Sequence, residues 1–144
     1  MKTKILAMAA VLLLSLGAAS KCRAQSRSIE VNVPFAFEVG NKSMPAGSYR
    51  VESVPTGAGS IEILRSNNGG VRLPISTTAT TSINGTPASA LIFHQYGNRY
   101  FLAEIQTGDG HARELLPSQQ EKEVARSGHR IEIAVVNQTA AGKL

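Results

Sequence analysis

The chain has 144 residues, of which 42% are hydrophobic and 17% charged, and its formal net charge is +5. A basic chain of this size would ordinarily suggest binding to nucleic acid or to acidic membranes. The distribution of charge excludes that interpretation, because four of the 15 basic residues lie within the first 24 positions. Without Lys2, Lys4, Lys21 and Arg23, 11 basic residues face 10 acidic ones, and the net charge is only +1.

Residues 1–24 have the pattern of a secretory signal peptide. Two lysines precede an apolar run over 5–16, which is too short to span a membrane and is followed by small residues. Cleavage after Ala24 fits best, with Ala19 as an alternative, and predicts export to the periplasm or outside the cell. The single cysteine, Cys22, leaves with this segment, and the lysine before it argues against a lipid anchor. The mature chain therefore has no disulfide and no thiolate.

The first part of the mature chain predicts two strands. Residues 29–39, "IEVNVPFAFEV", alternate strictly between apolar and polar or small positions, so we expect one strand with all its large apolar side chains on one face. Pro34 cannot donate to a ladder, so this strand lies at an edge or bends there. A second strand over 48–54 has Tyr49 and Val51 on its inner face.

Three further segments follow before residue 90. Over 60–66, Ile61 and Ile63 alternate with Glu62, which predicts a strand with the two isoleucines inward. The sequence "NNGG" at 67–70 suits positive φ angles and a tight hairpin turn. The returning strand over 71–75 has its inner face formed by Val71, Leu73 and Ile75. Residues 76–88 are rich in Thr and Ser and allow either a polar edge strand or a loop.

The only predicted helix covers about residues 118–126. Ser118 is the expected N-cap, Glu121 completes a capping box three residues later, and Gly128 ends the helix. The helix is short and charged on most sides, so we expect it on the surface. A last strand over 129–136 should bury its alternating apolar residues, which are Ile131, Ile133 and Val135.

These elements predict an all-β fold: a single antiparallel β-sandwich or small barrel of about seven or eight strands with one short C-terminal helix. We assign residues 25–137 to this one domain and expect residues 138–144 to form a frayed tail.

Three segments resemble a known family. They are "VPFAFEVGNKSMPAGSYRV" (33–51), "FHQYGNRYFLAEI" (93–105) and "RELLPSQQEKEVAR" (113–126). In pattern they are similar to a family of small exported bacterial proteins common in soil acidobacteria. The resemblance implies export and a β-rich fold. It implies no catalytic residues, because the family carries no assigned activity.

The segment 90–105 holds the densest group of polar and aromatic side chains. Gly97 and Asn98 predict a two-residue turn that pairs His94 with Phe101, Ile92 with Ala103 and Leu91 with Glu104. In this register His94 and Glu104 lie on opposite faces and cannot form an acid–base pair without a register change or a bulge. His94 is then most simply a histidine hydrogen-bonded at the core or its rim. The alternative is a recognition surface at the turn, formed by His94, Tyr96, Arg99 and Tyr100.

No motif of the chain predicts catalysis, a cofactor or a metal. His94, His111 and His129 show no metal-ligand spacing, and the latter two each follow a glycine at the start of a strand. Nucleophile-elbow and phosphate-loop patterns are absent from the sequence.

We therefore expect an exported, non-catalytic module with a binding or structural role. Its partner would be an unknown protein, a cell-envelope component or a small ligand, and not nucleic acid; the mature chain should be a monomer without a transmembrane segment. The first alternative is a small barrel that binds an apolar ligand. The second alternative is a metal-dependent enzyme that uses the histidines.

Overall fold

A computed structural model describes residues 28–81 and 88–136. The predicted signal peptide (1–24) and tail (138–144) lie outside the described residues. In chain order the elements are β1 (Ser28–Val33), β2 (Phe37–Val39), β3 (Lys42–Met44), β4 (Gly47–Thr56), β5 (Gly59–Ser66), β6 (Arg72–Ile75), β7 (Thr77–Thr81), β8 (Ser89–Tyr96), β9 (Arg99–Thr107), β10 (His111–Leu115), α2 (Gln119–Ser127) and β11 (Arg130–Val136). Within these ranges no helix is long and apolar enough to cross a membrane.

The strands form two sheets that enclose one core. The first sheet has the order β1-β4-β5-β6, and the second has the order β11-β8-β9-β10-β7. The short strand β2 pairs with β3 and joins β9 in parallel. The sheets do not close into a barrel, so the sandwich alternative is confirmed and the barrel alternative is wrong. The predicted seven or eight strands are too few, because the described residues form 11 strands. The strand expected over 29–39 is divided in two, β3 was not predicted, and residues 77–81 form a strand.

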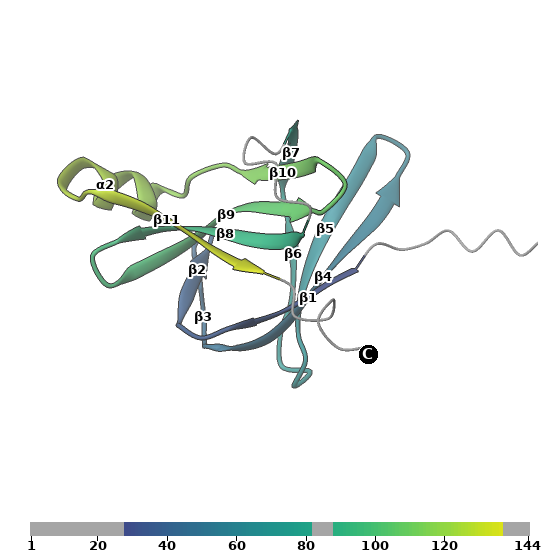
Figure 1. The fold of residues 1–144 in the computed structure, drawn as a ribbon, viewed down its shortest axis with the longest axis horizontal. Helices are drawn as coiled ribbons and strands as arrows, with labels where there is room; N and C mark the ends of the chain where they lie inside the picture. Colours follow the sequence, from purple (N-terminus) through teal and green to yellow (C-terminus); the bar gives the residue numbers. More distant parts are fainter. Residues whose placement is uncertain (1–27, 82–87, 137–144) are drawn as a thin grey trace, which may run out of the picture.

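The chain passes from one sheet to the other at three positions, one of which lies between β3 and β4. The single strand predicted over 29–39 is wrong, because β1 belongs to the first sheet and β2 to the second. Pro34 lies between them, so the predicted bend is confirmed. The last change of sheet occurs at Ser76, after which residues 77–81 form an edge strand, while 82–87 lie outside the described residues. Strands that switch sheets make the corners of a sandwich whose two sheets cross steeply (Figure 1).

The core contains apolar side chains from both sheets. Phe37 lies at its centre, with edge-on ring contacts to Tyr49 at 5.1 Å and to Phe93 at 5.2 Å. The Tyr49 hydroxyl donates to the Pro45 carbonyl oxygen at 2.5 Å, and burial raises the pKa of this tyrosine. Tyr49 and Val51 are buried as predicted.

The predicted inner face of β5 is wrong for Ile61, which is 45% exposed. Ile63 is buried as predicted but lies outside the core cluster, and the face toward the core carries Glu62 and Leu64. The register explains the reversal, because Leu64 stands opposite Val51 on one side and Leu73 on the other, and both neighbours face the core. Glu62 is therefore brought between the sheets.

Glu62 is only 3% exposed, and its charge is compensated from the second sheet. Arg113 of β10 places its Nε 3.2 Å from Glu62 Oε1, and the Ser53 hydroxyl donates to the same oxygen at 3.0 Å. A buried carboxylate is stable only when it is paired in this way. This ion pair joins the two sheets.

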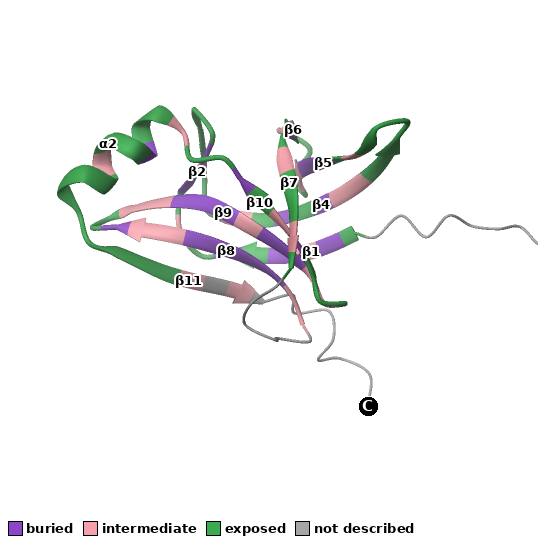
Figure 2. Cartoon of the chain, turned by 90° about the horizontal axis from the view of Figure 1, so that it is seen from above, coloured by how far each residue is buried: buried purple, intermediate pink, exposed green. Residues whose placement is uncertain are grey.

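Strand β11 is less buried than predicted. Ile131 is 53% exposed, and Ile133 and Val135 are only partly buried. The reason is the position of β11, which is the outermost strand of the second sheet. Figure 2 shows its exposed first half lying away from the strands of the first sheet.

Candidate functional site

The β8–β9 hairpin organises the polar side chains that the sequence singled out. Gly97 has a φ of +60°, as the predicted turn requires, and the pairing of His94 with Phe101 is confirmed. A β-bulge between Ile92 and Phe93 then shifts the register, so that Ile92 stands opposite Glu104 instead of Ala103. The prediction that His94 and Glu104 lie on opposite faces is therefore wrong. Both face outward from the second sheet, on the side away from the core.

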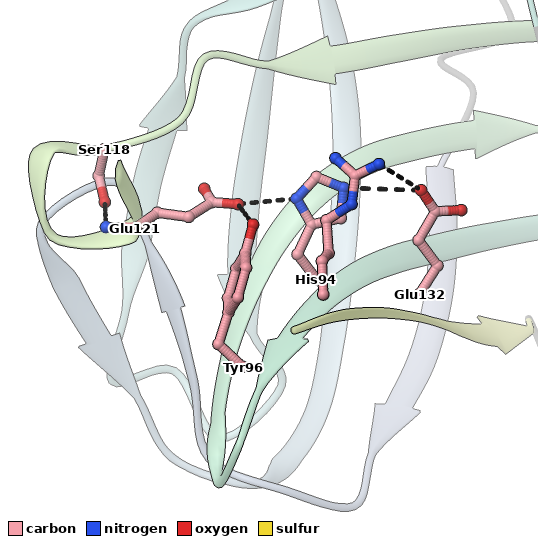
Figure 3. A network of polar contacts seen from close by, with 6 residues as sticks. His94, Tyr96, Ser118, Glu121 and Glu132 are labelled. Carbon is pink, nitrogen blue, oxygen red and sulfur yellow. Dashed lines mark hydrogen bonds and ion pairs between the residues drawn. The ribbon is translucent and has the colours of Figure 1, made fainter. Parts of the chain in front are cut away.

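Helix α2 attaches to this outer face through one buried carboxylate. His94 Nδ1–H donates to Glu121 Oε1 at 2.7 Å, and the Tyr96 hydroxyl donates to the same oxygen at 3.5 Å (Figure 3). Because a carboxylate only accepts, this contact assigns the proton to Nδ1 of the imidazole. The predicted hydrogen bonding of His94 inside the fold is confirmed.

The predicted capping box forms only in part. The Glu121 backbone N–H donates to the Ser118 hydroxyl at 3.1 Å, which confirms Ser118 as the N-cap. The side chain of Glu121 does not return to the N-cap and reaches His94 instead. Glu121 is the only buried residue of α2, so a polar contact docks this helix on the sheet.

The environment of Tyr96 follows from the same contact. Burial, and after it the charge of Glu121, raise the pKa of the Tyr96 phenol, while Arg130 acts in the opposite direction. The second nitrogen of His94 lies 3.9 Å from Glu132 Oε1. Both nitrogens of the imidazole ring thus face carboxylates, one from α2 and one from β11.

Beyond His94 the outer face is hollowed into a groove of about 220 Å³, which we call the outer groove. Its floor contains Ile92, Ala103 and Gln106, all three buried. Gln106 donates from Nε2 to Glu104 Oε1 at 2.9 Å, which holds that carboxylate beside the floor. Strands β7 to β11 all contribute residues to the lining.

The walls of the outer groove are predominantly acidic. Glu104 and Glu114 stand directly opposite each other on β9 and β10, and Glu132 lies across the groove on β11. Arg130 is the only permanent cation among the lining residues, and it lies 3.8 Å from Glu132. Like charges directly opposite each other in a ladder are destabilising. The predicted recognition turn contains none of these wall residues, and Glu104 was considered only as a partner of His94.

The four residues of the predicted recognition turn divide between two faces. Arg99 shares the face of His94 and Tyr96, and its guanidinium binds Glu38 at 2.5 Å and Gln120 at 3.1 Å. Tyr100 lies on the opposite face, stacked on Phe35 with ring centroids 4.0 Å apart. Recognition by these four residues together stays a prediction.

The three histidines lie apart along the second sheet. His111 begins β10 at the level of Ser89, which is five residues, or about 17 Å, along β8 from His94. His129 precedes β11 and is exposed. In the described ranges no three His, Cys, Asp or Glu residues are grouped so that they could hold a metal ion.

Comparisons with family models, curated proteins and solved structures find no match for this chain. The resemblance to the acidobacterial family therefore stays a prediction. The class of protein that the fold defines is an all-β sandwich with one docked helix.

Proposed function

We propose that the mature chain is an exported, non-catalytic binding module that holds a cationic group in the outer groove. The export part of this proposal is supported by the N-terminal sequence alone. One observation carries the binding proposal: a groove with a buried, partly apolar floor and acidic walls on the face of the second sheet that does not form the core.

The size of the groove limits its ligand. Sites for whole cofactors or drug-sized molecules usually have volumes of about 300–1,000 Å³. The outer groove, at about 220 Å³, fits a single side chain or a small amine better. Its floor supplies the apolar residues Ile92 and Ala103, which could contact the methylene groups of a lysine or polyamine chain.

The charge of the groove sets the chemistry of the ligand. Three carboxylates face one arginine, so the lining has an excess of two negative charges when His94 is neutral. No described side chain forms an ion pair with Glu104 or Glu114. A cation between Glu104 and Glu114 would relieve their mutual repulsion.

His94 contributes as a wall of this groove. Its Nδ1–H is committed to Glu121, and its Nε2 faces Glu132 across 3.9 Å. The first contact commits Nδ1 to the docking of α2, whereas Nε2 lies too far from Glu132 for a hydrogen bond.

The apolar-ligand alternative required a barrel with an open interior, and the two sheets do not form a barrel. The interior between the sheets is filled by side chains, several of which have no exposed surface at all, including Val33, Leu64, Leu91 and Phe93. We therefore place the apolar-ligand alternative second.

The proposal is tested by titration of the ¹⁵N-labelled mature protein in NMR spectra. The probes are spermidine, a short lysine-containing peptide, and the same peptide with its lysine side chains acetylated. We expect saturable shifts of the amides of Ile92, Ala103 and Gln106 that weaken as salt is added. A response to the peptide alone would indicate a protein partner, and a response to spermidine as well would indicate free amines.

Two variants make the test specific. Glu104→Gln combined with Glu114→Gln should weaken binding by about tenfold or more, which is about 1.4 kcal/mol. Glu123→Gln, on the exposed side of α2, removes the same kind of charge and should change nothing. If neither amine produces a saturable shift up to about 10 mM, where even a millimolar ligand would saturate, the binding proposal is wrong.

A further inference from the structure

The outer edge of β11 has no partner strand among the described residues. β11 pairs along its whole length with β8 on one side, from Arg130 opposite Tyr96 to Val136 opposite Ala90. On its other side it is the last strand of the second sheet. Figure 2 shows it as the outermost strand, with α2 on the far side of β8 and β9. Such an edge exposes unpaired N–H and C=O groups that can pair with another chain.

The edge of β11 lacks the proline that interrupts the edge strand β6. Pro74 removes a backbone donor from β6. β11 has no proline, pairs with β8 without a register shift, and exposes Ile131 at 53%. Ile131 shares its face with Ile133 and Val135, both partly buried. A regular edge strand with an exposed apolar face favours strand pairing.

We propose that a second copy of this chain pairs antiparallel with β11, about a two-fold axis that passes beside Ile131. In this arrangement each exposed Ile131 packs against the partner's Ile131. Arg130 of each chain stands directly opposite the partner's Glu132, which gives two identical cross-strand pairs of opposite charge. Such pairs stabilise antiparallel ladders, and a two-fold axis is the most common symmetry of protein dimers.

The neighbouring two-fold registers are less favourable. An axis beside Arg130 would place that arginine opposite its own copy, and an axis beside Glu132 would do the same for the glutamate. Both arrangements set like charges directly opposite each other. An axis beside Ile133 would leave Arg130 and Glu132 without opposite charges across the interface. Charge complementarity therefore selects the axis at Ile131.

The pairing extends beyond β11 itself. Gly128 has an extended backbone, but its N–H already donates to the Val124 carbonyl oxygen at 2.9 Å, so residues 129–133 can form the new ladder. A ladder of this length buries less than the roughly 800 Å² per partner of a standard interface. We therefore expect a weak dimer that forms as protein concentration rises, and not the monomer that the sequence predicted.

The dimer would also bring two binding grooves together. Arg130 and Glu132 line the outer groove, so each groove would lie beside the shared ladder and share its wall with the other. The pairing itself does not depend on whether the groove binds a cation.

Sedimentation velocity of the mature protein over a concentration series tests the proposal. We expect the average mass to rise from one chain toward two chains. Arg130→Glu gives a chain with acidic residues at positions 130 and 132, and Glu132→Arg gives a chain with arginines at both positions. Each variant alone should associate about tenfold more weakly than the wild type, because like charges then face each other.

An equimolar mixture of the two variants provides the decisive measurement. In the mixture, positions 130 and 132 of one variant are acidic and face the arginines of the other variant, so association should return. Misfolded variants would not regain association on mixing, so loss of folding cannot explain that result. Glu123→Arg and Arg126→Glu, on the exposed surface of α2, are matched controls that should dimerise like the wild type. A wild-type protein that stays a single chain at every concentration, or a dimer that survives both reversals, would overturn the proposal.

Discussion

Glu121→Ala tests whether one buried carboxylate holds helix α2 on the sheet. Hydrogen bonds to charged groups contribute about 1.5–3 kcal/mol, and the His94 contact at 2.7 Å is of this kind. The Tyr96 contact, at 3.5 Å, adds little. A nine-residue helix has almost no stability of its own. We therefore expect the variant to lose about 2 kcal/mol of unfolding free energy and to release the helix.

Two measurements on the same variant separate release of the helix from general destabilisation. Urea unfolding followed by circular dichroism gives the loss of stability, and hydrogen exchange locates it. Exchange of the amides of residues 122–127 should accelerate strongly, while the strands β4 and β8 keep their protection. Glu121→Gln keeps an acceptor oxygen and should lose about half as much.

The control for this prediction lies two residues along the same helix. Glu123→Ala removes an exposed carboxylate and should change stability by less than about 0.5 kcal/mol. If Glu121→Ala and Glu123→Ala behave alike in both measurements, the docking role assigned to Glu121 is refuted.

Three other predictions concern single positions. Arg113→Ala leaves Glu62 buried without its cation and should cost about 3 kcal/mol in urea unfolding; replacing both residues with apolar ones should recover most of the loss. Gly97→Val forces a β-branched residue to a φ of +60° and should cost about 1–3 kcal/mol, seen as a lower melting temperature, whereas Asn98→Ala should cost less. Because the pKa of Tyr96 is raised in the folded protein, its neutral form contributes stability that is present below about pH 10 and lost as the pH rises further. Tyr96→Phe should therefore flatten the alkaline decline in unfolding free energy, and an unchanged decline would contradict the assignment.

The alternation of apolar residues was sufficient to predict the fold class. Over 29–39 and 49–51 the large apolar residues alternate, and the structure buries all of them except Phe35, which is partly buried. The same rule failed at "IEIL" (61–64), because Leu64 extends the apolar run and makes either face possible. Pairing with Val51 and Leu73 then decides which face turns inward. Such pairing depends on segments that are distant in the sequence, so local periodicity could not supply it.

The candidate groove was harder to predict than the fold. Its geometry depends on the bulge beside Ile92, and no glycine or other local signal marks that position in the sequence. Arg130 and Glu132 could have been found, since alternation along β11 sets both opposite the face of Ile131. Their pairing with β8, which brings them beside His94, was not visible from the sequence.

His94 takes part both in the docking of helix α2 and in the lining of the outer groove. Nδ1 of His94 docks α2 through Glu121, and Nε2 faces Glu132, which belongs to the outer groove. A cation that binds Glu132 changes the electrostatic environment of the ring, and the ring in turn carries the contact that holds the helix. Coupling between two such events is reciprocal, so a docked helix and an occupied groove affect each other by the same free energy. The short linker from α2 to β11 reinforces this connection, because the strand that supplies Glu132 begins three residues after the helix ends.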